Sequence, residues 1–159
     1  MGQTAAMTYR LAGTGIWSAS LRYGDPAAAA DAATELEEQG WSAVWIPDVG
    51  GDLFAAVGNL LTATSSMTVA TGILNLWMHE PADTAAAHRA FVAEHGRRFL
   101  VGIGVSHAPL IDAVNAEAGH YRRPLARTAA YLDELDAASP PLPAEDRVLA
   151  ALGPKMLEL

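Results

Sequence analysis

The stretch RFLVGIGVSHAPLID, residues 98–112, begins as an apolar run typical of a buried strand and ends as a loop with a histidine and a proline. Gly102 and Gly104 interrupt the run where larger residues would pack better, since a glycine in a strand buries no side chain and costs ordering entropy. Along an extended chain, one face carries Val101, Ile103 and Val105, whereas the other carries only Gly102, Gly104 and Ser106. We expect the bare face to line a pocket; the alternative is that the glycines only permit tight packing inside a barrel or against a helix.

Strand-like and helix-like segments alternate on both sides of this stretch. We predict strands over 13–21, 41–48 and 67–77, at the start of 98–112, and over 147–153. Helices are predicted over 25–40, 51–64, 80–96 and 124–138, and another begins at residue 154. Asp25-Pro26 and Pro81 are typical helix starts, and Gly40 and Gly96 typical stops. The proline-rich segment 139–146 is predicted as a connecting loop.

Strands that are almost continuously apolar and alternate with helices indicate a parallel sheet covered by helices. Two α/β architectures agree with this pattern. A five-stranded doubly wound parallel sheet would be complete at 159 residues. An incomplete (β/α)8 TIM barrel would have about 250 residues when whole. The last apolar helical face, with Met156, Leu157 and Leu159, breaks off after about two turns, which favours the truncated barrel.

Composition limits the classes of partner. The chain is 51% hydrophobic with a net charge of −8, and no cluster of Lys or Arg predicts binding to nucleic acid or to an anionic membrane. The absence of cysteine excludes disulfides, thiolate metal sites and cysteine nucleophiles, and it fits a reducing compartment. The first ten residues lack the apolar core of a signal peptide, and no segment is long enough for a membrane helix. We therefore expect a cytoplasmic protein.

The carboxyl ends of the predicted strands are the expected location of chemistry, because both architectures bind ligands there. These ends carry Trp17-Ser18, Pro47-Asp48, residues 75–79, Ser106-His107 and Gly153-Pro154. Such a polar and aromatic set with little charge is more typical of a site for a flat conjugated ligand than of a hydrolase. The sequence lacks the nucleophile elbow GxSxG, the phosphate loop GxxxxGK[ST] and the zinc motif HExxH. We predict no metal site.

Four segments together carry a resemblance to a known family. They are VWIPD in the second predicted strand, VATGILNLW in the third, RFLVGIGVSHAPL in the fourth and RVLAALGPKMLEL from the fifth onward. In this order they resemble the bacterial-luciferase-like flavin and deazaflavin oxidoreductases, particularly a subgroup expected to use coenzyme F420. The resemblance runs through residues 13–159, and its last motif lies mid-chain in family members. It implies a single luciferase-like domain over 1–159, truncated after the fifth strand of the TIM barrel.

The resemblance also implies a site. In this family the third strand ends in a bulge with a non-proline cis peptide bond that supports the centre of the ring, and here it falls at Gly72-Ile73. Asp48 resembles a family carboxylate near the ring, although many F420 members follow that acid with histidine and this chain has Val49. His107 stands where the fourth strand presents a polar group to the ring or the substrate. The implied catalytic residues are His107 and Asp48, and the implied cofactor-binding residues are Asp48, Gly72, Ile73, Asn75, Gly104, Val105, Ser106 and His107.

Each candidate has a plainer alternative. His107 could be an ordinary loop histidine, and Asp48 could stabilise a turn through its side chain. His79 precedes Glu80-Pro81 and fits a helix start as well as a site. Trp17 and Trp77 could stack on a ring or simply pack in the core.

The predicted function is hydride transfer between coenzyme F420 and a small organic substrate, with His107 as the first choice for proton transfer and Asp48 as the second. One alternative is an FMN-dependent monooxygenase of the same superfamily, because the ring-binding features do not separate the two cofactors. Another is a truncated, non-catalytic relative. Open edges at the first and fifth strands would favour pairing with another chain, so we expect a homodimer.

Overall fold

The computed structural model describes residues 13–114 and 121–159, without the side chain of Val114. The strands are β1 (Gly15–Trp17), β2 (Ala43–Ile46), β3 (Thr68–Thr71), β4 (Leu74–Asn75), β5 (Phe99–Gly104) and β6 (Arg147–Leu149). The helices are α1 (Ser20–Tyr23), α2 (Pro26–Glu38), α3 (Leu53–Ala63), α4 (Pro81–His95), α5 (Ala108–Val114), α6 (Pro124–Ala137) and α7 (Pro154–Leu157), with a 3₁₀ turn at Ala144–Asp146.

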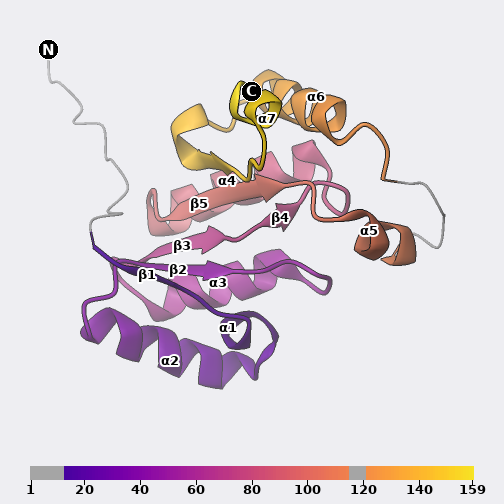
Figure 1. The fold of residues 1–159 in the computed structure, drawn as a ribbon. Coiled ribbons are helices and arrows are strands. Elements are labelled where there is room, and N and C mark those ends of the chain that lie inside the picture. Colours follow the sequence, from indigo (N-terminus) through magenta and orange to yellow (C-terminus); the bar gives the residue numbers. More distant parts are fainter. Residues whose placement is uncertain (1–12, 115–120) are drawn as a thin grey trace, which may run out of the picture.

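All strand pairs are parallel, and the order across the sheet follows the order along the chain (Figure 1). β1 pairs with β2 and β2 with β3. β3 and β4 pair with successive parts of β5 on one side, and β6 pairs with β5 on the other. A doubly wound sheet reverses its strand order at a switch point, and this sheet does not. The doubly wound alternative is therefore wrong, and the fold is that of an incomplete barrel.

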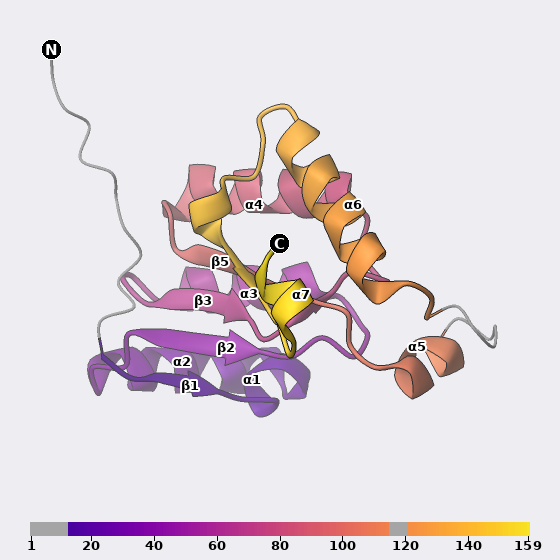
Figure 2. The ribbon, with the colours of Figure 1, turned by 45° about the horizontal axis from the view of Figure 1, so that its top comes forward.

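The apolar core lies between the sheet and the helices α2, α3 and α4, which cover one face (Figures 1 and 2). In α3, four apolar side chains at helical spacing are fully buried, as the sequence predicts: Leu53, Val57, Leu60 and Leu61. They pack against strand residues of one parity, including Val44, Ile46, Val69, Phe99 and Val101. The opposite parity faces the barrel side, where Trp17 is 58% exposed and Val148 38% exposed. Both faces of the sheet are buried along β3 and β5, and the barrel side is exposed at β1 and β6.

The helix boundaries follow the signals in the sequence. The Asp25 carboxylate accepts a hydrogen bond from the N–H of Ala28 at 3.0 Å, with Pro26 at the first helical position of α2. Gly96 ends α4 with a φ of 71°, a conformation in which glycine is favoured. Residue choice at the helix ends therefore fixes where each connection returns to the sheet.

Two predicted strands are shorter than expected. The first is not a strand over 13–21, because the chain leaves the sheet after Trp17 and turns into the short helix α1. α1 holds the loop that follows β2: Arg22 donates to the carbonyl of Gly50 at 2.7 Å, and the Tyr23 hydroxyl accepts from the Val49 N–H at 2.7 Å. The last strand ends at Leu149 rather than 153, since residues 150–153 bend away toward α7.

Two predicted loops contain helical turns. Residues 108–114 form helix α5, with Pro109 in its first turn, where the missing N–H of a proline is tolerated. The proline-rich segment 139–146 connects α6 to β6 as predicted, but it ends in the 3₁₀ turn Ala144–Asp146. No helix among residues 13–114 and 121–159 combines the length and apolar character that crossing a membrane requires.

Candidate functional site

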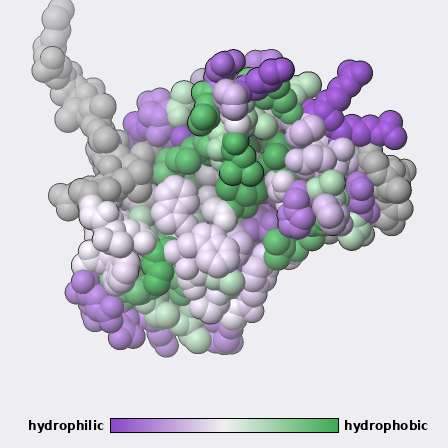
Figure 3. Space-filling view, in the orientation of Figure 1, coloured by the Kyte–Doolittle hydropathy of each residue, from purple (hydrophilic) through white to green (hydrophobic). Residues whose placement is uncertain are grey.

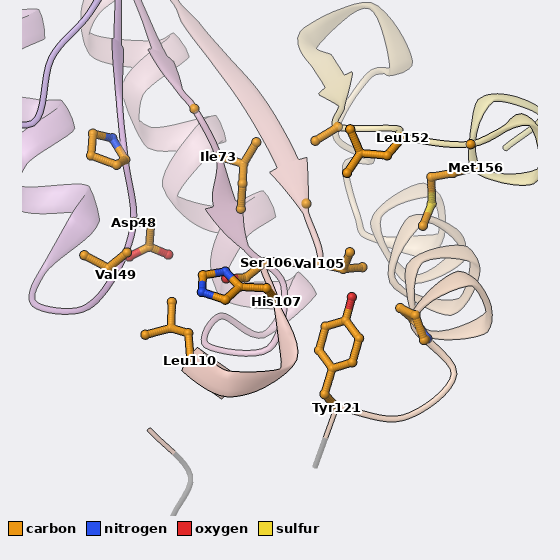
Figure 4. Close-up of a pocket in the computed structure, with 16 residues that line it drawn as sticks. Asp48, Val49, Ile73, Val105, Ser106, His107, Leu110, Tyr121, Leu152 and Met156 are labelled. Atoms are coloured by element: carbon orange, nitrogen blue, oxygen red, sulfur yellow. The ribbon is translucent and has the colours of Figure 1, made fainter. Parts of the chain in front are cut away.

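A cavity with a volume of about 650 Å³ lies beyond the carboxyl ends of β2, β3, β5 and β6. This volume is within the usual range for small-molecule sites. Its wall is mostly apolar, with Asp48, Ser106, His107 and Tyr121 as the residues with polar side chains. Figure 4 shows Asp48 and Val49 on one side and Leu152 and Met156 on the other, with His107 and Tyr121 near α5. The cavity is therefore where both barrel and doubly wound sheets place ligands.

The predicted third strand is interrupted at the cavity wall. Its two halves, β3 and β4, are separated by Gly72 and Ile73, and the peptide bond between these residues is cis, as predicted. The Trp17 indole donates to the carbonyl of Gly72 at 2.8 Å, so Trp17 supports the bulge from the barrel side. Both Gly72 and Ile73 line the cavity.

The two glycines on the bare face of β5, the fourth predicted strand, have different surroundings. A Cβ on Gly102 would overlap the carbonyl oxygen of Thr71, so this glycine permits close packing of two strands and does not line the cavity. A Cβ on Gly104 would lie 2.9 Å from Cγ1 of Ile73 and 3.2 Å from Cβ of Ala150, inside the cavity wall. The pocket prediction therefore holds at Gly104, and the packing alternative holds at Gly102.

Asp48 is the buried acid of the cavity wall, and its side chain has no exposed area. Its Oδ2 accepts from the backbone N–H of Asn75 at 3.0 Å and lies 2.8 Å from Nε2 of His79. Among the described residues, its Oδ1 is buried and has no hydrogen-bond partner. A buried carboxylate oxygen normally has a partner, so Oδ1 is an unsatisfied acceptor in a residue of the cavity wall.

Asn75 does not line the cavity, unlike the other predicted cofactor-binding residues. It is fully buried behind the wall, where its N–H holds Asp48 and its side-chain oxygen accepts from the N–H of Trp77 at 3.1 Å. Trp77 in turn donates from its indole to the carbonyl of Val105 at 2.9 Å. Asn75 and Trp77 therefore tie the end of β4 to Asp48 and to β5, and the predicted contact of Asn75 with a cofactor stays a prediction.

Ser106 and His107 form the turn from β5 into α5. Ser106 has a φ of 54°, a left-handed conformation that is uncommon for residues other than glycine. The carbonyl of His107 accepts from the N–H groups of Leu110 and Ile111, which fixes the start of α5. The imidazole of His107 is exposed at the cavity rim and has no hydrogen-bond partner among the described residues. His107 can therefore meet a ligand from the solvent side of the cavity.

Several cavity residues were not predicted from the sequence. Leu110 comes from α5, which the sequence analysis treated as a loop, and Tyr121 follows residues outside the described part of the chain. Leu152 and Met156 approach from the far end of the chain. Apolar side chains of this kind carry no local signal, since their position depends on how distant segments pack.

A second histidine–aspartate pair lies at the opposite end of the sheet. His88 Nε2 is 3.1 Å from Oδ2 of Asp146, and Arg97 pairs with Oδ1 of the same carboxylate. Burial lowers the pKa of His88, and the nearby positive charges of Arg97 and Arg147 lower it further, against the opposing effect of Asp146. Among the described residues, no group of three or more acids and histidines could hold a metal ion.

A parallel α/β sheet wound in one direction, with a ligand cavity beyond the carboxyl ends of its strands, defines a barrel-type ligand-binding protein. The chain belongs to the luciferase-like monooxygenase family, whose pattern it matches over residues 9–159. The predicted single domain also includes residues 1–12 and 115–120, which lie outside the described part of the chain.

Solved structures share this fold at low sequence identity. An F420-dependent secondary alcohol dehydrogenase, in complex with an F420-acetone adduct, is 21% identical with a TM-score of 0.65, over 75% of this chain and 39% of that one. The coenzyme F420-dependent tetrahydromethanopterin reductase of Methanopyrus kandleri is 18% identical with a TM-score of 0.66, over 91% of this chain and 51% of that one. The oxygenating constituent of 3,6-diketocamphane monooxygenase from Pseudomonas putida, in complex with FMN, is 14% identical with a TM-score of 0.62. This match covers 76% of this chain and 37% of that one. The chain thus spans about half or less of the length of these proteins.

Proposed function

We propose that the cavity binds the tricyclic ring of coenzyme F420 and that the chain belongs to an oxidoreductase acting on a small organic substrate. The observation that carries this proposal is Oδ1 of Asp48, a buried and partnerless acid oxygen in the wall of an otherwise apolar cavity. An apolar cavity with few convergent polar groups is typical of a site for a flat conjugated ligand. Fold relatives named as F420-dependent agree with the proposal.

The residues present fit such a ring. Glycine at 104 leaves space that a Cβ would fill, so the wall beside Ile73 can stay flat. Ile73 and Val105 supply apolar contact, and Ser106 lines the same cavity. Exclusion of water from an apolar site strengthens each polar interaction inside it.

When bound, F420 would supply the position that accepts or donates the hydride. Asp48 would hold or move a proton at Oδ1, while the N–H of Asn75 fixes the orientation of its carboxyl group. His107 would hold or move a proton at the rim, where its imidazole is exposed. His107 thus serves the substrate side of the cavity and Asp48 the buried side.

Purification from a host that produces F420, followed by mass and absorption measurements on the bound ligand, tests the proposal. A deazaflavin supports it. FMN would favour an FMN-dependent monooxygenase instead, and a chain that cannot be loaded with either ring would favour a non-catalytic relative.

Asp48→Asn is the variant that tests the carrying observation. It keeps the shape of the side chain and removes its charge, so we expect the rate of hydride transfer in a single turnover to fall about 100-fold. Asp133→Asn, on α6 and outside the cavity wall, is the matched control and should leave the rate unchanged. An unchanged rate in Asp48→Asn would contradict the role of Oδ1.

We also propose that residues 1–159 are part of one barrel domain. A gene map in which the next open reading frame resumes at the following strand would support this proposal.

We propose that the chain forms a homodimer. Gel filtration with light scattering measures its oligomeric state.

We propose that the protein works in the cytoplasm. Fractionation of the native cells measures its location.

A further inference from the structure

Asp48 and His79 form a continuous polar connection from the cavity to water. Oδ1 of Asp48 has no partner in the cavity wall, while Oδ2 lies 2.8 Å from Nε2 of His79. Nδ1, the other ring nitrogen of His79, has no hydrogen-bond partner among the described residues and is not one of the polar atoms shut off from solvent. The side chain of His79 is 15% exposed. His79 is therefore the member of the pair that reaches solvent.

His79 is the side chain that pairs with the buried carboxyl group of Asp48. The carboxyl group has no exposed area, and His79 is its only ion-pair partner among the described residues. A buried carboxylate without a compensating charge is strongly unfavourable, because the protein interior screens it poorly. The backbone N–H of Asn75 stabilises the negative form but carries no full charge. Among the residues that the structure describes, the imidazole of His79 is the group placed to supply a compensating positive charge at Oδ2.

Other ionisable groups near the pair have different partners or positions. Arg22 donates to the carbonyl of Gly50, and Tyr23 accepts from the N–H of Val49, so both hold the loop after Asp48. Glu80 follows His79 in the chain and precedes α4. His107 lines the same cavity from the turn after β5. None of these forms an ion pair with Asp48 among the described residues, so the pair acts as a unit.

We propose that His79 is the charge-compensating partner through which Asp48 exchanges its proton with water. This inference rests on the proposed function of the cavity. The pair has two forms of equal net charge, carboxyl with neutral imidazole and carboxylate with imidazolium. When Oδ1 gives a proton to the cavity, Nδ1 takes one from water, and the reverse direction restores the first form. One proton leaves as one enters, so no net charge is buried.

His79 is a positioning residue in this scheme, because it acts through Asp48 and does not line the cavity. Its aromatic contact with Phe54, at 5.3 Å between ring centroids, fixes the ring against α3. A glutamine could still donate a hydrogen bond to Oδ2 but could not take a proton. His79→Gln therefore separates a proton-exchanging role from a purely structural one.

The matched control is His95→Gln. His95 also lies beside an acid, with 3.8 Å between Nε2 and the Glu94 carboxylate, and its side chain is 11% exposed. It stands at the end of α4, away from the cavity wall. The two substitutions thus remove the same kind of side chain from a similar degree of burial.

The first test needs no cofactor. In the full chain labelled with ¹⁵N-histidine, NMR should show His79 with its proton on Nε2 and none on Nδ1 at high pH, identified by the signal lost in His79→Gln. A proton on Nδ1 instead would overturn the proposal, since Nε2 could then not donate to Asp48.

The second test uses the chain loaded with F420. We expect His79→Gln to slow hydride transfer about 10-fold or more at neutral pH, with an affinity for F420 within about threefold of wild type. Millimolar imidazole should restore part of the rate in His79→Ala, and His95→Gln should match wild type. A His79→Gln rate equal to wild type, or no rescue, would overturn the inference while leaving the proposed function in place. A chain that binds no ring would instead overturn the proposed function, and the inference with it.

Discussion

The two ends of the sheet each hold a buried histidine–aspartate pair, yet the two pairs differ in what surrounds them. At the carboxyl ends, Asp48 has one oxygen without a partner beside a cavity, and His79 reaches water. At the amino ends, Asp146 is held by His88 and by Arg97. The same two residue types therefore lie in different surroundings, because Asp48 borders the cavity at the carboxyl ends and Asp146 is also paired with an arginine.

Further polar contacts surround the His88–Asp146 pair at the amino ends of the strands. Arg147 pairs with Asp136 at 2.6 Å and donates to the carbonyl of Leu142, which holds the connection from α6 to β6. The carboxyl ends instead carry exposed apolar side chains, with Val49 54% exposed and Leu152 fully exposed. Figure 3 shows apolar side chains gathered toward the middle of the face in view. The amino ends thus carry additional polar contacts, and the carboxyl ends carry exposed apolar side chains.

The largest effect should come from Asp146→Ala. It removes the buried carboxylate that contacts Arg97 and the buried His88, while Arg97 keeps Glu145 at 3.4 Å, so we expect the free energy of unfolding to fall by about 3 kcal/mol. Urea denaturation followed by circular dichroism measures it. Asp48→Asn should change the free energy of unfolding by less than about 1 kcal/mol, because its amide still accepts a hydrogen bond. Equal losses in the two variants would remove the distinction between the ends.

The two glycines of β5 should differ in a similar way. In Gly102→Ala the added methyl group meets the backbone carbonyl of Thr71, which cannot move freely, so we expect a loss of about 2 to 3 kcal/mol in the free energy of unfolding. In Gly104→Ala it meets the end of the Ile73 side chain, which can shift, so the loss should be about 1 kcal/mol. Ring affinity, measured by fluorescence titration, should fall only in Gly104→Ala. Weaker ring binding in Gly102→Ala alone would reverse our assignment of the two positions.

The pH dependence of the free energy of unfolding should reveal the contribution of His88, which pairs with Asp146 at the amino ends of the sheet. The pKa of His88 lies below its ordinary value of 6.5, chiefly because of burial, so the unfolded chain binds the proton more readily than the folded one. The stability that His88 contributes is fully present above pH 6.5 and is lost as the pH falls below it. Urea midpoints measured between pH 7.5 and 5.5 should fall in wild type and fall less in His88→Gln. Identical slopes in the two proteins would contradict this role of His88.

The smallest effect should come from Glu37, which supports the amino end of β3 from α2. Burial raises its pKa, but hydrogen bonds from Ser65, Ser66 and Met67 outweigh burial and hold the pKa at about 2. This contribution is present above pH 4.5 and is lost as the pH falls toward 2. Glu37→Gln should cost about 1 kcal/mol at pH 7, after allowance for solvent screening, and less at pH 3. A cost that grows at low pH would contradict the assignment.

Much of the architecture could be predicted from local sequence. Apolar runs placed the strands, Asp25-Pro26 and Pro81 placed helix starts, and Gly96 placed a helix end, because these residues act on their own backbone. The resemblance to a family placed the cis bond at Gly72-Ile73. Helix α5 was missed because the histidine and proline near its start are also typical of a loop.

The site was only partly predictable. The position of Asp48 at the end of a strand followed from strand order, and the seven predicted residues other than Asn75 line the cavity. The pairing of Asp48 with His79 joins positions 31 residues apart, and no spacing rule connects them. The different uses of Gly102 and Gly104 likewise depend on which neighbouring strand approaches each one.

By itself, the sequence determined the alternation of strands and helices, the helix ends and the carboxylate at the end of β2, since these depend on residues close in the chain. Only the tertiary structure decided which aspartate is closed by arginines and which faces a cavity. Charge pairing, burial and free space are properties of groups brought together by packing, and the two histidine–aspartate pairs differ in all three.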